Sequence, residues 1–203
     1  FDTAEEEVLK ALKGFAENAE GEDAFQKLLF AEDTARGFAF IELCRKRYDV
    51  IVMNPPFGAP SLGSKEYMSA NYVNERSDIF TAFVSRMCHI KAIQGSVGCI
   101  SNRTSFFITS FKNWRIKLFE EQSMFSFVDL GSGVLDAMVE TCAYLITRST
   151  HRETTFLDLM HSDRKQEALI QAINSDSFYS LPLSAFRKLP NFSISHWISK
   201  EEL

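Results

Sequence analysis

The sequence predicts an α/β fold with a doubly wound, mostly parallel sheet, antiparallel strands at its edge and helices on both faces. Strand and helix patterns alternate through most of the chain, which is typical of parallel strands joined by helices. The 203 residues are 45% hydrophobic and include 19 Phe. The chain can therefore bury a core of one large domain.

The N-terminal segment, residues 1–26, predicts a peripheral amphipathic helix. Thr3 is a suitable cap, Glu6 closes a capping box, and an apolar stripe follows, made of Val8, Leu12 and Phe15. Residues 27–30 then predict a short strand, and a helical pattern leads to the next strand at Tyr48. We expect a strand, helix, strand unit here.

Residues 48–53, YDVIVM, predict a strand buried on both faces, because β-branched and apolar side chains fill the run. The strand ends in the tetrapeptide NPPF, which can neither extend a sheet nor begin a helix at once. A polar stretch over residues 58–78 follows, and it predicts a long loop without helix or strand.

Two further helix and strand repeats follow this loop. Asp78 begins a helix with one apolar face, and residues 96–101 predict the next strand. A loop around NRTSFF leads to a second helix, whose stripe includes Trp114 and Leu118, and then to a strand over residues 125–130.

The pattern changes in the last third of the chain. Residues 139–147 and 154–160 predict strands with only short polar links before them, which favours antiparallel pairing at the sheet edge. Residues 163–174 suit a helix. From residue 176 the sequence predicts a connection to a further domain.

Bulk properties narrow the class of protein. The chain opens on Phe1, has no signal-peptide pattern and has no apolar run of about 18 residues. We expect a piece of a larger cytosolic protein with no membrane partner. The four cysteines lie far apart in apolar stretches, which favours free thiols over disulfides or a metal site.

Charge is unevenly distributed along the chain. The net charge of −5 arises within residues 1–49, which hold 12 acidic and 7 basic residues, so the remainder is neutral. Residues 79–119 contain basic side chains and no acidic one. A local nucleic-acid-binding surface would explain this segment, and solvated helix faces explain it equally well.

The NPPF tetrapeptide has the composition of a site for a planar amine. Its position beyond a strand is where open α/β sheets bind ligands. The prolines fix φ and offer no N–H, so carbonyl oxygens point outward, and Asn54 adds a side-chain oxygen. If Asn54 and the Pro55 carbonyl hold both N–H bonds of a heteroaromatic amine, its nitrogen becomes a better nucleophile. Phe57 would stack on the base. The alternative is a turn that merely ends a strand.

These residues resemble catalytic motif IV, Asn/Asp/Ser-Pro-Pro-Tyr/Phe, of S-adenosylmethionine-dependent adenine-N6 DNA methyltransferases. The resemblance covers roughly residues 27–150 and continues in order through NPPFGAPSLGSKEY, SDIFTAFVSRM, GSVGCISNRTSFFITSFKNWR and FVDLGSGVLDAMVETCAYLI. Together these stretches are similar to the phage-exclusion methyltransferases of BREX systems (PglX) and, more distantly, to type IIG restriction-modification enzymes.

The resemblance implies a partial Rossmann-like methyltransferase fold. Residues 27–175 would form the C-terminal part of the catalytic domain, and residues 176–203 would lead toward a target-recognition domain. The implied cofactor is S-adenosylmethionine, and the implied partner is double-stranded DNA in the bacterial cytoplasm. Other subunits of a defence complex are further candidate partners.

The resemblance also implies roles for individual residues. Asn54, Pro55, Pro56 and Phe57 would form the catalytic motif, with Phe57 stacked on an adenine flipped out of the duplex. Asp33 would bind the donor's adenine amine, although its surroundings depart from the family pattern, and Glu32 or neither could serve. The expected DNA contacts come from the 58–78 loop and from the turn after the next strand: Lys65, Arg76, Asn102, Arg103 and Thr104.

The stretch FVDLGSG, residues 127–133, also resembles the Gly-rich methyl-donor loop of these folds. That loop needs a following helix and a parallel strand, and such a crossover takes about a dozen residues or more. Few residues separate Gly133 from the strand expected at Val139. We therefore expect a hairpin here, with the donor-binding half upstream of Phe1 and the fragment inactive alone.

Three functional hypotheses follow. The first is a segment of a site-specific adenine DNA methyltransferase acting in phage defence or restriction-modification. The second keeps the site and changes the acceptor to a protein glutamine amide. The third is a non-catalytic methyltransferase-like subunit that binds DNA or assembles a defence complex.

Overall fold

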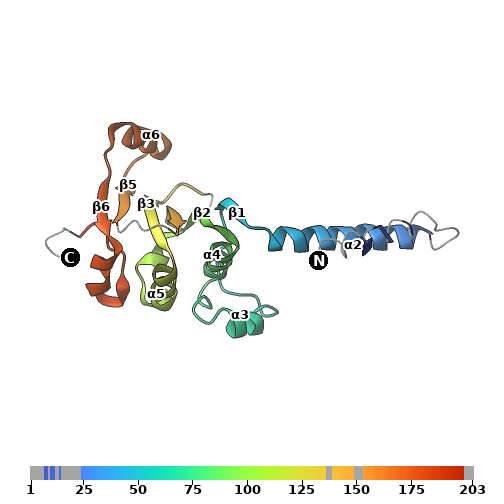
Figure 1. Cartoon of the computed structure of the whole chain (residues 1–203). Helices are drawn as coiled ribbons and strands as arrows, with labels where there is room; N and C mark the ends of the chain where they lie inside the picture. The colour runs from blue at the N-terminus through green and yellow to red at the C-terminus, as the bar shows by residue number, and fades with distance from the viewer. Residues whose placement is uncertain are drawn as a thin grey trace. The chain divides into compact units, whose positions relative to one another are not determined.

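The computed structural model describes residues 7, 8, 10, 11, 14, 24–135, 139–148 and 153–198. The chain divides into two units, Phe1–Arg47 and Tyr48–Leu203. Figure 1 shows the elements of both. Among the described residues, no helix is long and apolar enough to cross a membrane.

The N-terminal unit contains helix α2, Ala24–Arg45. The strand predicted over residues 27–30 is wrong, because these residues belong to α2, and the strand, helix, strand unit is absent. A short apolar run does not separate a strand from a helix by periodicity alone, and helix-forming Leu, Ala and Glu continue this run. Of the helix predicted at the N-terminus, Glu7, Val8, Lys10, Ala11 and Gly14 are helical, and the rest lies outside the described residues.

The second unit is built on a six-stranded sheet with the order β1-β2-β4-β3-β5-β6. The strands are β1 Tyr48–Met53, β2 Lys91–Asn102, β3 Ser123–Gly131, β4 Thr141–Thr147, β5 Glu153–Asp158 and β6 Tyr179–Pro182. Pairs β1–β2 and β3–β5 are parallel, whereas β4 and β6 run antiparallel to their neighbours.

The sheet is therefore mixed rather than mostly parallel. β4 turns back from β3 as the predicted hairpin, but it lies between β2 and β3 and not at the edge. β5 pairs with the other side of β3 and is parallel to it, contrary to the prediction. A short link between two strands predicts only that the chain reverses direction. It does not predict which other strand each of the two will pair with.

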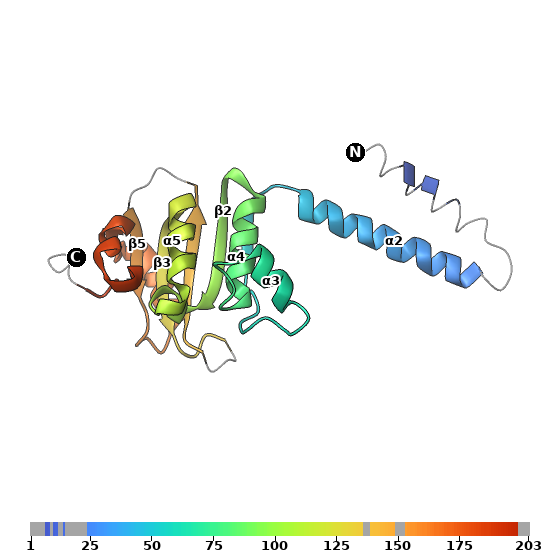
Figure 2. The ribbon, with the colours of Figure 1, turned by 90° about the horizontal axis from the view of Figure 1, so that it is seen from below.

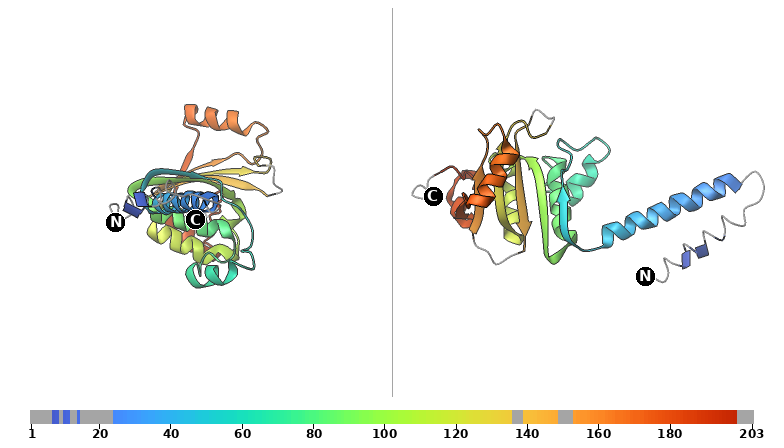
Figure 3. Two further views of the ribbon diagram at one scale, coloured as in Figure 1. Left: turned by 90° about the vertical axis from the view of Figure 1, so that its right-hand side faces the viewer. Right: turned by 90° about the horizontal axis from the view of Figure 1, so that it is seen from above.

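Helices cover both faces of the sheet, as predicted. Helices α4, Ile79–Ile90, and α5, Lys112–Glu121, lie side by side on one face (Figure 2). Helix α6, Lys165–Ser175, lies on the other face (Figure 3). The short helix α3, Lys65–Asn71, interrupts the 58–78 stretch, which was expected to be a loop throughout. Residues 179–182, expected within a connection, form β6, and 3₁₀ helices η3, Leu183–Lys188, and η4, Pro190–Phe192, follow it.

The main core fills the space between the sheet and helices α4 and α5. Its centre is aromatic: Phe106 makes edge-to-face contacts with Trp114, Phe127 and Tyr144 at centroid distances of 5.6, 5.2 and 4.9 Å. Burying a large apolar side chain of this kind stabilises a fold by roughly 1.5–3 kcal/mol. A smaller cluster under α6 contains Leu130, Leu157, Leu159 and Ala172.

Strand β1 is an edge strand with one covered face, so the prediction of burial on both faces is wrong. Ile51 and Met53 pack against the main core, whereas Val50 is 67% and Val52 81% exposed. Within the described residues no strand pairs with the outer edge of β1. The composition of β1 is typical of a central strand, although β1 is an edge strand in the described part of the chain.

Candidate functional site

Strand β1 places the NPPF tetrapeptide at the carboxyl edge of the sheet. Met53 pairs with Cys99 of the parallel strand β2, and Asn54 is the next residue. Asn54 and Pro56 are exposed, Pro55 is buried and Phe57 is half-buried. The Phe57 ring packs edge-on against Phe80 of α4, with 6.0 Å between centroids and an interplanar angle of 89°. The tetrapeptide thus has exposed polar groups above a buried aromatic support.

The residue after the tetrapeptide has a backbone conformation that needs glycine. Gly58 has φ +121°, a region that side-chain-bearing residues rarely adopt. Its N–H donates to Oδ1 of Asp78 at 2.9 Å, and its carbonyl accepts from the N–H of Ile79 at 2.8 Å. The two ends of the 58–78 stretch are therefore fastened to each other at the site.

The turn after β2 lies at the same edge of the sheet, because β1 and β2 are parallel. Oδ1 of Asn102 accepts from the N–H and the hydroxyl of Thr104 at 2.9 and 2.8 Å, which caps the 3₁₀ helix η1, Arg103–Phe106. The structure places Asn54 and Asn102 at the ends of the neighbouring parallel strands β1 and β2.

Arg103 is the most constrained residue of this turn. Its guanidinium donates to both carboxylate oxygens of Asp129 at 2.7 and 2.6 Å and to Glu140 at 2.8 Å, and its side chain is 11% exposed. Burial alone would lower the pKa of Arg103, but the hydrogen bonds and charges of Asp129 and Glu140 outweigh it and raise the pKa.

The carboxylate of Asp129 connects β3 with the turn at Arg103 and with the C-terminal segment that contains His196. It is fully buried near the end of β3, and Nε2 of His196 lies 3.1 Å from Oδ2, while Nδ1 of His196 lies 2.5 Å from the Tyr179 hydroxyl. Burial would raise the pKa of Asp129, but hydrogen bonds from His196 and Arg103 and the charge of Arg103 lower it. Sequence analysis did not assign this residue a role, and the available signal was a carboxylate inside the apolar run FVDLG.

The loop residues expected at DNA are exposed on a well-anchored segment. Lys65 and Arg76 are both exposed, whereas Glu75, next to Arg76, is fully buried. Oε1 of Glu75 accepts from Ser85 of α4 at 2.8 Å and from Nζ of Lys117 of α5 at 3.0 Å. This anchor was also missed, because nothing in the local sequence separates Glu75 from a surface acid.

The family model of the Eco57I restriction-modification methylase matches residues 2–134 of the chain. The chain belongs to this family. A curated relative, the adenine-specific methyltransferase PglX of Lacticaseibacillus casei (strain Zhang), is 24% identical over 175 residues. The match covers 77% of this chain, which spans only 14% of that relative. The predicted resemblance to restriction-modification methyltransferases is confirmed.

Solved structures of low sequence identity share the fold of this Eco57I-family chain. The type IIG restriction endonuclease BpuSI has a TM-score of 0.57 at 14% identity, covering 76% of this chain and 21% of that chain. The type I restriction-modification methyltransferase subunit from Streptococcus thermophilus has a TM-score of 0.52 at 18% identity, with 64% and 32% covered. A mixed sheet is thus compatible with the fold of these enzymes.

Asp33, the expected donor contact, lies on helix α2 of the N-terminal unit. It is exposed, and both it and Glu32 lie near Arg36, at 3.9 and 3.7 Å between charged atoms. The stretch FVDLGSG runs from β3 into the hairpin with β4, and Gly131 and Gly133 have positive φ at this turn. Because β4 pairs antiparallel with β3, the described residues of this stretch do not have the strand, loop, helix arrangement of a donor loop.

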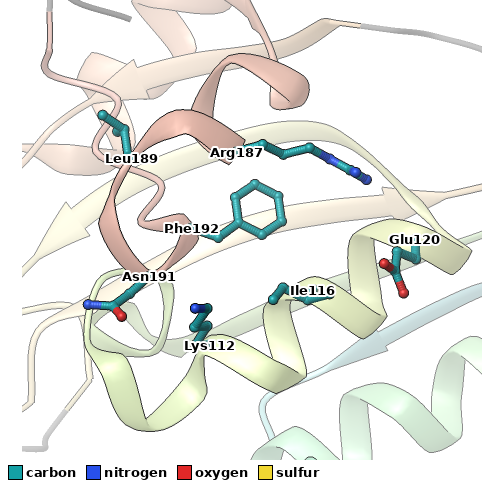
Figure 4. Close-up of a pocket in the computed structure, with 7 residues that line it drawn as sticks. All are labelled: Lys112, Ile116, Glu120, Arg187, Leu189, Asn191 and Phe192. Carbon is teal, nitrogen blue, oxygen red and sulfur yellow. The ribbon is translucent and has the colours of Figure 1, made fainter.

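One of the four cysteines lies beside the candidate site, because Cys99 pairs with Met53, the residue before Asn54. None of the four cysteines forms a disulfide, and burial raises the pKa of Cys88 and of Cys99 to about 12, which disfavours their reactive thiolate forms at neutral pH. The described residues contain no cluster of three or more side chains suited to a metal. A pocket of about 260 Å³ lies between α5 and the 3₁₀ segments (Figure 4), lined by Lys112, Ile116, Glu120, Arg187, Leu189, Asn191 and Phe192.

Proposed function

We propose that this Eco57I-family chain forms the acceptor side of the active site of an adenine-specific DNA methyltransferase. The observation that carries the proposal is the placement of NPPF. Asn54 is exposed directly beyond a parallel strand, and the half-buried Phe57 is supported from below by Phe80. Two oxygen acceptors beside an aromatic ring suit a planar base that bears an NH₂ group.

The chemistry requires a change at the amine nitrogen of adenine. Its lone pair is delocalised into the ring, so the amine is a weak nucleophile. Oδ1 of Asn54 and the Pro55 carbonyl would accept its two N–H bonds and favour the geometry in which the lone pair leaves the ring plane. As the new N–C bond forms, these oxygens stabilise the positive charge on nitrogen, and one N–H proton then leaves to solvent.

S-adenosylmethionine, the cofactor implied by family membership, would supply the methyl group: the S–CH₃ bond of its sulfonium would break as the N–C bond forms, leaving a neutral thioether. The described residues fit the acceptor side of this reaction. Asp33, with Glu32 as its alternative, is the candidate donor contact in this chain, and FVDLGSG forms a hairpin. The exposed Val50 and Val52 support the proposal that a donor-binding part of the catalytic domain covers β1.

The DNA partner is proposed from the polar groups around this edge. Lys65 and Arg76 are exposed and suited to phosphate contacts, which position a protein on a duplex without reading its sequence. The turn formed by Asn102, Arg103 and Thr104 lies at the end of β2, the strand beside β1. Arg103 would contact DNA there while it keeps its ion pairs with Asp129 and Glu140. Among structures of similar fold, the restriction-modification enzyme LlaBIII is bound to DNA.

Methyl transfer by the full-length protein tests this proposal. With labelled S-adenosylmethionine and duplex DNA, we expect label in adenine, and Asn54→Ala should abolish transfer because one of the two acceptors is lost. A matched control is Asn174→Ala, which changes an exposed asparagine on α6, outside the site. Label on a protein glutamine instead of DNA would favour the second hypothesis, and no transfer at all would favour a non-catalytic subunit.

A further inference from the structure

Gly58 and Asp78 join the NPPF tetrapeptide to the start of helix α4. They are 20 positions apart in sequence, yet both backbone polar groups of Gly58 are bound there: its N–H to Oδ1 of Asp78 and its carbonyl to the N–H of Ile79. A glycine with positive φ has the least intrinsic restraint on its backbone. The orientation of the preceding tetrapeptide therefore depends on what holds Gly58.

Asp78 is itself rigidly placed. The same Oδ1 that binds Gly58 also accepts the N–H of Phe80 at 3.2 Å and caps α4. The Asp78 carbonyl accepts the hydroxyl of the buried Thr81 at 2.6 Å, and the same hydroxyl also donates to the carbonyl of Glu75 at 2.8 Å. One carboxylate oxygen thus connects Gly58 with the first turn of a helix.

The first turn of α4 is fixed to the core of the sheet. Phe80 is fully buried and packs against Trp114 at 5.7 Å and Phe111 at 5.9 Å between centroids. It also supports the ring of Phe57. The tetrapeptide is therefore held at two points by the same helical turn, through the Phe57 ring and through the Gly58 backbone.

We propose that Asp78 is a positioning residue for methyl transfer, whose carboxylate holds the Gly58 amide and so fixes the acceptor oxygens of Asn54 and Pro55. This inference rests on the proposed function. Catalytic geometry tolerates little displacement, and an error of about 1 Å costs on the order of 100-fold in rate. Asp78 contacts no substrate in this role and acts only through the loop.

Three substitutions of Asp78 in the full-length protein distinguish the effect of its hydrogen bond to Gly58 from the effect of its helix cap. Asp78→Ala removes both, and Asp78→Asn keeps an oxygen in place for both. Asp78→Ser keeps a favoured helix cap with a side chain one bond shorter, which does not reach Gly58. Glu153→Ala, which changes an exposed acid at the start of β5, is the control, because it lies at the opposite end of the sheet from the site.

The expected result is a loss of kcat with little change in KM. Asp78→Ala and Asp78→Ser should lower kcat roughly 100-fold, with KM for S-adenosylmethionine within about threefold, while Asp78→Asn and Glu153→Ala keep most activity. Hydrogen exchange of the peptides containing Gly58 and Ile79 should accelerate in the Ala and Ser variants alone, and this readout does not depend on activity.

Two outcomes would overturn the inference. The first is a Ser variant whose Gly58 amide exchanges faster while kcat stays at the wild-type value. The second is an Asn variant as slow as the Ala variant with unchanged exchange. Failure of the proposed function looks different, because then the wild-type protein does not methylate DNA or Asn54→Ala retains methylation.

Discussion

The residues at the site are of two kinds: side chains that face solvent, and buried acids that connect the segments around the site. Asn54 is exposed, as a side chain that receives an amine must be, whereas Asp129 and Glu75 are fully buried acids. The sequence carries a local signal for the first kind, because NPPF is a short motif, and the role of Asn54 stays a prediction. It does not predict the second kind, because the partners of Asp129 lie 26 and 67 positions away.

Acidic pH tests the role of Asp129. Its pKa is lowered in the folded state, so folding favours the ionised carboxylate. That stabilisation is fully present above the ordinary carboxyl pKa, about 4, and is lost as pH falls through the lower folded-state value. In urea denaturation from pH 7 to pH 3, the loss of stability caused by Asp129→Asn should shrink below about pH 4. A loss that is equal at both ends of this range would contradict the proposed pairing.

At the scale of secondary-structure elements, helices α4 and α5 hold the 58–78 loop in place. Helices α4 and α5 were predicted from their apolar residues and are present in the structure, where both helices bury apolar side chains: Phe80 and Val84 of α4, and Trp114 and Leu118 of α5. Helix α3 was missed, because its polar sequence has no such stripe. The anchor at Glu75 connects these elements, since it joins the loop to α4 and α5.

Removing the amine from this anchor should loosen the loop. Lys117→Met leaves Glu75 with Ser85 as a remaining partner, and its other oxygen, Oε2, is already buried without one. We expect a loss of about 1–3 kcal/mol in the free energy of unfolding and faster hydrogen exchange over residues 58–78. Lys112→Met, an exposed lysine on the same helix, should change stability by less than about 0.5 kcal/mol. Equal effects of the two changes would sink this account of the anchor.

At the scale of the whole molecule, the sequence predicted an α/β sheet covered by helices on both faces and missed the order of its strands. Hairpin β3–β4 was expected from the few residues after Gly133, but its insertion beside β2 depends on long-range pairing such as Cys99 with Tyr144. The exposed Val50 and Val52 belong to the same scale, because the composition of β1 predicts burial on both faces and the structure covers only one of them.

The exposed face of β1 leads to a prediction about methylation by the full-length protein. The proposed acceptor side lies at the edge of a sheet whose outermost strand, β1, has apolar side chains open to solvent. If a donor-binding part of the domain covers β1, then Val50→Lys and Val52→Lys should impair methylation by the full-length protein while leaving the isolated chain as stable as before. Denaturation of the isolated chain and methylation by the full-length protein measure the two effects. Full activity in both variants would contradict this cover.

The most direct test of adenine methylation is mass spectrometry of nucleosides from the DNA of cells that produce the full-length protein. We expect N6-methyladenine in DNA from cells with the wild-type protein and none from cells with Asn54→Ala, at equal protein levels and with unmodified host DNA as background. Methylation that persists in Asn54→Ala, or its absence with the wild-type protein, would contradict the assignment of NPPF as the acceptor side of the active site.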